Sequence, residues 1–261
     1  MTDFNYAEAR VELGSLMQSI GEKVLTLRRE GSLQVQEKMG HTDIVTAADL
    51  FSEERLVRHI QRHYPDHGVI GEEGALIPSQ SGYTWRFDPI DGTVPYSNGS
   101  DCFGISAGLE KDGVPIFGII HYPALHDTLA AARGKGCSVP AKWERPPAET
   151  LKEASVVADI QVGKEHFYGL VRSRVKLVQI FGSVVYDVRE LVRGKVDAMF
   201  HTGATPFDIA AGIVIVREAG CTVSGILTDE LDLTQPKIPI IMSRSERLRD
   251  ELRELLAPVL S

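Results

Sequence analysis

The 261-residue sequence predicts a mixed α and β chain (α+β in its first half, α/β in its second) whose halves meet near residue 145. Near the N-terminus, two segments carry apolar residues at every third or fourth position, which is typical of amphipathic helices. The middle of the chain consists of short apolar runs between turn residues, and the C-terminal part alternates strand-like with helix-like segments. A proline-rich passage at Pro140, Pro146 and Pro147 is the best candidate boundary between residues 1–145 and 146–261.

Two helices are expected in the first half. The first covers residues 6–30 and ends at Gly31. Its apolar positions are Leu13, Leu16, Met17, Ile20, Val24 and Leu27. The second covers residues 47–64 and precedes Pro65, which cannot continue a helix. The polar residues 38–43 between the two helices are expected to form a loop.

Strands are expected in the middle of the chain, and strands alternating with helices are expected after it. Asp112 and Gly113 between two apolar runs predict a tight hairpin. The expected strands cover residues 68–71, 84–87, 103–109, 114–122, 128–133, 154–160, 176–181, 198–201 and 238–242. The expected helices of the second half cover residues 183–193, 207–219 and 246–260.

The composition excludes several classes of protein. A net charge of −8 disfavours a binder of nucleic-acid backbones, which requires a basic face, and 43% hydrophobic residues exclude an intrinsically disordered chain. The three cysteines are too few and too scattered for a disulfide framework or a zinc knuckle. The first ten residues show no signal-peptide pattern, and no apolar run approaches the roughly 18 residues of a membrane span. We therefore expect a soluble, cytoplasmic protein with no membrane partner.

The most informative motif is Asp88-Pro-Ile-Asp91-Gly-Thr93. An apolar strand leads to Asp88, a second aspartate follows three residues later, and Gly92 permits a close approach of the backbone to a ligand. If Thr93 begins a helix or a tight turn, the N–H groups of Gly92 and Thr93 can face an anion. Two carboxylates beside an anion site suit a metal-bridged phosphate, although the motif alone also fits a β-turn with solvated aspartates.

Two further acidic segments strengthen the metal interpretation. Glu72 and Glu73 stand between two glycines at the end of a strand, and Asp208 lies in the first turn of an expected helix. An aspartate in that position can also be a simple helix cap, and Glu73 can be an outer or solvated carboxylate. Because no histidine or cysteine neighbours these carboxylates, the set favours a hard ion such as Mg²⁺ over zinc.

These segments together resemble the signatures of the inositol monophosphatase family, which are Mg²⁺-dependent, lithium-sensitive phosphatases. The matching segments are Gly-Glu72-Glu, Asp88-Pro-Ile-Asp-Gly-Thr and Phe-Asp208-Ile-Ala-Ala-Gly, and residues 38–49 resemble the mobile metal loop of the family. The order and spacing match over nearly the whole chain. The resemblance implies one domain over residues 1–261, with the αβαβα layered sandwich of the inositol monophosphatase and fructose-1,6-bisphosphatase type, and a homodimer.

The resemblance also implies roles for individual residues. Two or three Mg²⁺ ions are expected on Glu72, Asp88, the carbonyl of Ile90, Asp91, Asp208 and Asp43. The catalytic group is expected to comprise Thr93, Asp49, Glu72 and Asp91, with Thr93 hydrogen-bonded towards Asp49 to orient the attacking water. The small phosphorylated substrate is expected to contact Gly92, Thr93, Lys38, Gly182, Ser183, His201 and Asp208.

The substrate side departs from the family pattern. His201 stands seven residues before Asp208, where members that hydrolyse inositol phosphates usually carry a glutamate. This histidine either contacts substrate or is a strand-end residue with a local partner, and Phe207 replaces the usual tryptophan. The leading interpretation is therefore hydrolysis of a small polyol or sugar phosphate monoester, with the identity of the ester left open.

Four alternatives remain from the sequence. Three are enzymes: a 3′(2′),5′-bisphosphate nucleotidase, a histidinol-phosphatase and a fructose-1,6-bisphosphatase. The last would need a second cationic phosphate pocket, for which Arg172, Arg174 and Lys176 are candidates, although they also fit a solvated face. The fourth belongs to another class, a regulatory protein associated with RNA or RNA polymerase. Residues able to bind a metal stand at all of the expected ligand positions, which argues against a loss of catalysis.

Overall fold

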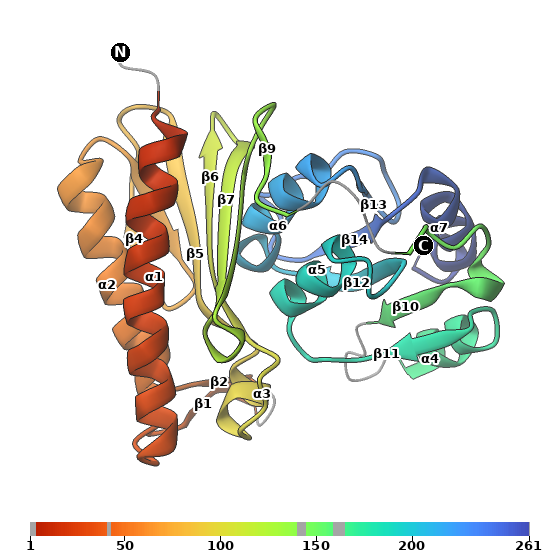
Figure 1. Cartoon of the computed structure of the whole chain (residues 1–261), viewed down its shortest axis with the longest axis horizontal. Helices are drawn as coiled ribbons and strands as arrows, with labels where there is room; N and C mark the ends of the chain where they lie inside the picture. Colours follow the sequence, from red (N-terminus) through yellow and green to blue (C-terminus); the bar gives the residue numbers. More distant parts are fainter. Residues whose placement is uncertain (1–3, 41–42, 140–144, 159–164, 261) are drawn as a thin grey trace.

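The computed structural model describes residues 4–40, 43–139, 145–158 and 165–260, and it shows five layers (Figure 1). Helices α1 (Tyr6–Arg29) and α2 (Ala47–His63) cover one face of a seven-stranded sheet. Helices α5 (Val184–Val192) and α6 (Pro206–Glu218) lie between this sheet and a five-stranded one. Helices α4 (Glu165–Arg172) and α7 (Glu246–Leu260) cover the outer face of the second sheet. The expected αβαβα sandwich is confirmed.

The first sheet has the strand order β4-β3-β5-β6-β7-β8-β9. Its strands are β3 (Gly68–Gly71), β4 (Leu76–Ile77), β5 (Tyr83–Asp91), β6 (Gly104–Lys111), β7 (Val114–Tyr122), β8 (Asp127–Ala132) and β9 (Gly136–Cys137). Strands β3 and β5 are parallel, so their carboxyl ends meet at the same edge of the sheet. The five strands expected in the middle of the chain are present, and β5 continues through Asp91 rather than ending at residue 87.

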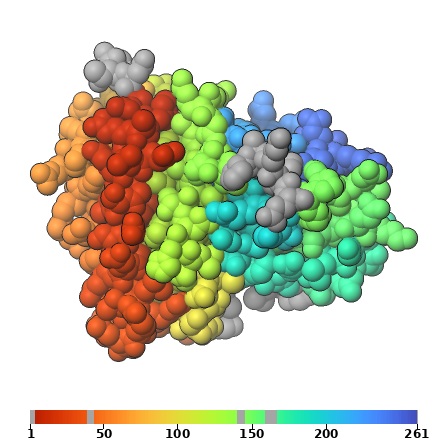
Figure 2. All heavy atoms as spheres, viewed as in Figure 1, coloured from red at the N-terminus to blue at the C-terminus, as the bar shows by residue number. Residues whose placement is uncertain are grey.

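The second sheet has the order β11-β10-β12-β14-β13. Its strands are β10 (Ser155–Ala158), β11 (Leu177–Gln179), β12 (Ala198–Ala204), β13 (Thr222–Gly225) and β14 (Ile238–Ser243). Strand β13 and helix α4 were not expected from the sequence. Short helical turns complete the described chain at α3 (Thr93–Ser97), η1 (Pro123–Leu125) and η2 (Leu151–Glu153). In the space-filling view, the two sheets and their helices form one continuous body (Figure 2).

The expected loop at residues 38–43 is wrong for its described part. Strands β1 (Gln36–Gly40) and β2 (Asp43–Val45) pair antiparallel as a small ribbon outside both main sheets. Because the exposed residues of this ribbon do not alternate apolar with polar side chains, the sequence carries no strand pattern there. None of the described helices combines the length and apolar character that a bilayer crossing needs.

Helix α6 lies unusually close to the first sheet, and this contact positions its N-terminus. A Cβ added to Gly108 on β6 would meet the Cβ of Ala210 at 2.7 Å, and one added to Gly118 on β7 would meet the carbonyl oxygen of Ala211 at 2.3 Å. Small residues on both sides therefore let helix and sheet backbones approach. Asp208, in the first turn of α6, is carried to the end of β5 by this packing.

Replacing Gly118 by alanine is expected to destabilise the fold by about 1–3 kcal/mol, because the new Cβ would overlap backbone that cannot rotate away. The matched control is Gly14→Ala in the interior of α1, where the nearest atom would lie 3.9 Å away. This control is expected to raise stability by about 0.5–1 kcal/mol, because alanine favours a helix over glycine. Urea unfolding followed by circular dichroism measures both changes, and equal stability of the two variants would contradict the close approach of α6.

Candidate active site

Three aspartates from two elements meet at the interface between the first sheet and the helix layer behind it. One carboxylate oxygen from each of Asp88, Asp91 and Asp208 lies within 4.8 Å of the other two. Asp88 and Asp91 end strand β5 and are 2% and 9% exposed, whereas Asp208 is partly buried in the first turn of α6. Asp88 and Asp91 are neighbours in the sequence, and the packing of α6 on the sheet brings the distant Asp208 to them.

Glu72 joins this group because β3 and β5 are parallel. It follows β3 directly, and its N–H donates to the carbonyl of Phe87 over 3.1 Å. Burial raises the pKa of Glu72 to about 7, the Lys38 ammonium opposes this rise, and the charge of Asp208 adds to it. The backbone hydrogen bond and the pairing of Gly71 with Phe87 place Glu72 beside Asp88, the residue that follows Phe87.

The site is electrostatically unfavourable when it holds only carboxylates. The pKa of Asp88 is raised well above its usual range, mainly by burial and next by the charge of Glu72. The pKa of Asp91 is likewise raised, mainly by burial and next by the charge of Asp208. The Oδ1 atom of Asp88 is buried and has no hydrogen-bond partner among the described residues. A cation among these oxygens would neutralise the repulsion and provide the missing partner, and an all-oxygen donor set fits Mg²⁺.

Asp91 is held in place by helix α5. Its Oδ2 atom accepts hydrogen bonds from the hydroxyl of Ser183 at 2.5 Å and from the N–H of Val185 at 2.7 Å. The same Ser183 oxygen caps α5 by accepting from the N–H of Tyr186. The structure places the hydroxyl of Ser183, which was expected to contact substrate, on the carboxylate of Asp91. Its position thus couples the start of α5 to the end of β5.

Asp208 is held in a similar way within its own helix turn. Its two carboxylate oxygens accept hydrogen bonds from the N–H and the hydroxyl of Thr205, both at 2.7 Å. Thr205 in turn accepts from the N–H of Asp208 and completes a capping box at the start of α6. Asp208 therefore both caps the start of α6 and belongs to the group of three aspartates.

The expected contact between Thr93 and Asp49 is present. The hydroxyl of Thr93 lies 3.3 Å from Asp49 Oδ1 and 2.9 Å from the carbonyl oxygen of Ile90. Asp49 Oδ2 accepts from the N–H and hydroxyl of Thr46, in a capping box at the start of α2. Burial, opposed by the hydrogen bonds from Thr46, raises the pKa of Asp49 to about 6. The pair joins α2 to the turn after β5.

A small pocket opens beside Thr93. Its volume is about 200 Å³, and its lining consists of Ile44, Glu72, Gly92, Thr93, Val94, Pro95 and Gly182. Gly92 has a φ of 85°, and a Cβ there would lie 2.8 Å from both the carbonyl of Cys102 and the side chain of Ser183. Only glycine fits this position, at the start of the short helix α3. The pocket therefore brings the expected substrate residues Gly92, Thr93 and Gly182 to one place next to Glu72.

Lys38 reaches the site from strand β1. Its Nζ lies 2.6 Å from Glu73 Oε1 and 3.4 Å from Glu72 Oε1. Burial lowers the pKa of Lys38, but the hydrogen bond to Glu73 and the two acidic charges outweigh it, and the net shift is upward. Lys38, expected to contact substrate, is therefore a fixed positive charge against the Glu72–Glu73 pair. Asp43 lies in β2, and its side chain falls outside the described part of the structure.

Two acidic residues near the site were missed in the sequence. Glu53 on α2 accepts hydrogen bonds from the N–H groups of Glu73 and Ala75, at 2.8 and 3.0 Å, and so holds the turn that presents Glu72. Asp187 on α5 lies 2.8 Å from the Nε2 of His201, which is 6% exposed. His201 thus has a local partner on the helix behind the site. Both acids occupy expected helices, where only their burial sets them apart from solvated carboxylates.

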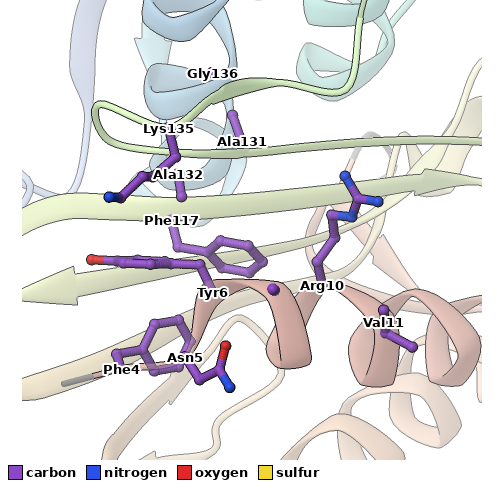
Figure 3. A pocket seen from close by; sticks show the side chains of 11 residues that line it. Phe4, Asn5, Tyr6, Arg10, Val11, Phe117, Ala131, Ala132, Lys135 and Gly136 are labelled. Carbon is purple, nitrogen blue, oxygen red and sulfur yellow. The ribbon is translucent and has the colours of Figure 1, made fainter. Parts of the chain in front are cut away.

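A second pocket lies elsewhere, at the start of α1 (Figure 3). Its volume is about 580 Å³, and it is lined by apolar residues such as Phe4 and Phe117 together with Arg10 and Lys135. None of the residues expected in the site lines it. The expected site residues Glu72, Gly92, Thr93 and Gly182 instead line the smaller pocket beside the carboxylates.

Comparisons with known proteins agree with this site. Residues 6–259 match the family model described as the inositol monophosphatase family. The chain is 30% identical over 242 residues to an inositol-1-monophosphatase of Synechocystis, covering 86% of this chain and 80% of the relative. It is 34% identical over 197 residues to a fructose-1,6-bisphosphatase/inositol-1-monophosphatase of Aquifex aeolicus, covering 70% and 73%.

A solved structure gives the same result at the level of the fold. The Thermotoga maritima IMPase superimposes with a TM-score of 0.85 at 28% identity, over 96% of this chain and 98% of that one. The family match spans both halves of the chain and includes every segment that carries a carboxylate of the site. The chain therefore belongs to the inositol monophosphatase family and is a phosphatase of phosphate monoesters.

Proposed function

We propose that the chain is a Mg²⁺-dependent phosphatase that hydrolyses a small polyol or sugar phosphate monoester. The observation that carries this proposal is the buried group of Asp88, Asp91 and Asp208, with Glu72 beside it and an unpartnered oxygen on Asp88. Carboxylates buried together without cations are unfavourable, so the arrangement is explained best by bound ions. The absence of histidine and sulfur ligands from this group favours Mg²⁺ over softer metals.

The ligands we propose are Glu72, Asp88, the carbonyl of Ile90, Asp91 and Asp208, with Asp43 from the β1–β2 ribbon, for two or three ions. When bound, Mg²⁺ supplies the positive charge that attracts the dianionic ester and lowers the pKa of the attacking water. Thr205 and Ser183 each bond one aspartate and so set the direction of its carboxylate. Glu53 accepts a hydrogen bond from the N–H of Glu73 and so holds the turn that carries Glu72.

Thr93 and Asp49 orient the attacking water in this proposal. In this proposal the Thr93 hydroxyl turns its one proton from the Ile90 carbonyl, 2.9 Å away, to Asp49 Oδ1, 3.3 Å away, and accepts a hydrogen bond from the water. The capping box with Thr46 keeps Asp49 in place, and thereby fixes the direction in which the Thr93 proton points. The phosphate of the substrate rests against Gly92 and Thr93 in the 200 Å³ pocket.

The substrate side favours a small monophosphate. His201 is buried against Asp187, so the position at which inositol-hydrolysing relatives carry a glutamate is occupied by an internal ion pair or hydrogen bond. The candidate cations for a second phosphate, Arg172, Arg174 and Lys176, are exposed at or just after the end of α4, which covers the outer face of the second sheet. They therefore lie on the opposite side of that sheet from α5 and α6, which argues against a bisphosphate pocket made from them.

Phosphate release from a panel of esters tests the proposed function. The panel contains inositol 1-phosphate, sugar monophosphates, histidinol phosphate, fructose 1,6-bisphosphate and adenosine 3′,5′-bisphosphate, each with Mg²⁺ and with a chelator. We expect Mg²⁺-dependent release, fastest from polyol or sugar monophosphates. Preference for a bisphosphate would overturn the substrate class. No release from any ester would overturn the proposed function and favour the RNA-associated binding role.

Replacing Asp91 by asparagine is expected to lower phosphate release at least about 100-fold even at saturating Mg²⁺, because it removes a charged ligand from the centre of the site. The matched control is Asp112→Asn in the exposed turn between β6 and β7, where the backbone has a φ of 51° that asparagine tolerates well. The control is expected to keep full activity. Unchanged turnover of the Asp91 variant would contradict the proposed ligand set.

The water-orienting role of Thr93 is tested by two substitutions that differ in one group. Thr93→Ser keeps the hydroxyl and is expected to retain activity within about tenfold, whereas Thr93→Val keeps the shape and is expected to lose about 100-fold or more in kcat. Steady-state kinetics at saturating Mg²⁺ separate kcat from KM. If the valine variant matched the serine variant in kcat, the hydroxyl would have no part in the reaction.

A further inference from the structure

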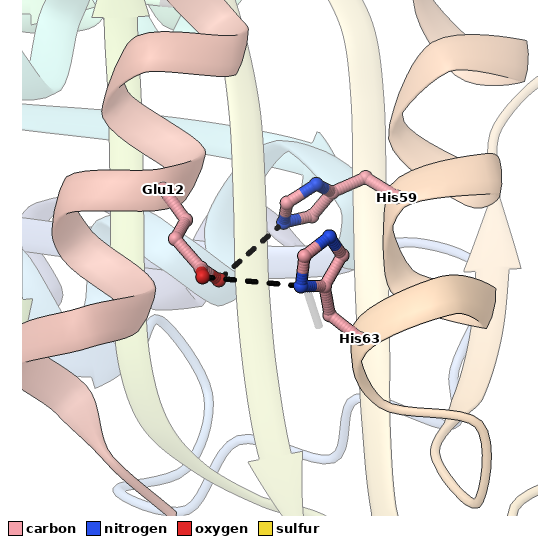
Figure 4. Close-up of side chains that lie close together, drawn as sticks. All are labelled: Glu12, His59 and His63. Atoms are coloured by element: carbon pink, nitrogen blue, oxygen red, sulfur yellow. Dashed lines mark ion pairs between the residues drawn. The ribbon is translucent and has the colours of Figure 1, made fainter.

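A second group of side chains of types that can bind a metal lies between α1 and α2, away from the aspartates of the first group. Glu12 extends from α1, and His59 and His63 extend from α2, one helical turn apart (Figure 4). All three point into the space between the helices. One donor atom from each lies within 4.8 Å of the donor atoms of the other two. The sequence did not single out these residues.

The contacts within this group are incomplete. His59 Nε2 and His63 Nδ1 each lie 3.8 Å from a different oxygen of Glu12, which is longer than a hydrogen bond. His59 Nε2 is buried and has no hydrogen-bond partner among the described residues. The two imidazole rings are stacked, with centroids 4.3 Å apart, so a positive charge on both would be repulsive. The group therefore contains a buried nitrogen without a hydrogen-bond partner and two stacked rings that would repel each other if both were charged.

The spacing suits a small ion with short bonds to nitrogen and oxygen. Zn²⁺ binds imidazole nitrogen and carboxylate oxygen at about 2.0–2.2 Å, so the ligand atoms of a tetrahedral site lie about 3.3–3.5 Å apart. The two 3.8 Å separations run to different oxygens of Glu12, and the three donor atoms lie within 4.8 Å of one another. They must therefore close by up to about 1.5 Å to reach the tetrahedral spacing, a movement that side-chain rotation can supply. Burial and the neighbouring His63 lower the pKa of His59, which favours the neutral ring that a metal requires.

We propose that Glu12, His59 and His63 bind one Zn²⁺ ion, with water as the fourth ligand, and that this ion links α1 to α2. Two imidazoles with a carboxylate select zinc over Mg²⁺, in contrast to the all-oxygen group at the end of β5. The side chains of Glu12, His59 and His63 are 29%, 14% and 39% exposed, so the ion can enter from solvent. His59 lies ten residues after Asp49, or about 15 Å along α2, which separates this site from catalysis.

Zinc titration of the full chain at saturating Mg²⁺ tests the proposal by calorimetry, with the carboxylate site common to all variants. Wild type is expected to bind one Zn²⁺ more than Glu12→Gln, or to bind it at least about tenfold more tightly. His63→Gln is expected to show the same loss. The matched control is His126→Gln, an exposed histidine after η1, which is expected to leave the titration unchanged.

Two further readouts keep the test independent of activity and of folding defects. Co²⁺ in the wild type is expected to give the strong visible absorption of a tetrahedral site, and Glu12→Gln is expected to lose it. Zn²⁺ is expected to raise the Tm of the wild type more than that of Glu12→Gln. If Glu12→Gln and His63→Gln fold as judged by circular dichroism and bind Zn²⁺ with wild-type stoichiometry and affinity, the proposal is overturned.

Discussion

Repulsion among buried carboxylates is the constraint on which this structure depends. Asp88, Asp91 and Asp208 share one site with oxygen atoms less than 5 Å apart, and Glu72 adds its charge. The hydrophobic packing of α6 against β6 and β7 brings them together, because glycine and alanine at the contact remove the side chains that would hold the layers apart. The fold therefore assembles an arrangement that is unfavourable on its own and becomes favourable when cations bind.

Three acids near the site accept hydrogen bonds from residues at the start of a helix. Ser183 and the N–H of Val185 hold Asp91, Thr205 holds Asp208, and Thr46 holds Asp49. These donors start helices α5, α6 and α2, so three helix caps converge on the same region. The caps fix the directions of the carboxylates before any ligand arrives, which is the preorganisation that a phosphatase site requires.

The main elements and the acidic motifs were predictable because their signals are local. Helices α1, α2, α6 and α7 follow apolar periodicity or capping residues, and the acids of the site stand in short motifs at the ends of strands or the start of a helix. The β1–β2 ribbon and the edge strand β13 were missed, because these short strands carry no alternating pattern of apolar and polar residues. Glu53 and Asp187 were missed because their roles arise only from tertiary contacts. The direction of Ser183, towards Asp91, likewise depends on how α5 packs.

The most direct test of the central claim is the thermal unfolding of Asp88→Asn with a chelator and with Mg²⁺. Because the substitution removes one repelling charge, the variant is expected to have a higher Tm than wild type in the chelator, by about 2–4 °C for each kcal/mol relieved. In Mg²⁺ the order is expected to reverse, because wild type binds the ions more tightly. A lower Tm of the variant in the chelator, or equal stabilisation of both proteins by Mg²⁺, would contradict the account.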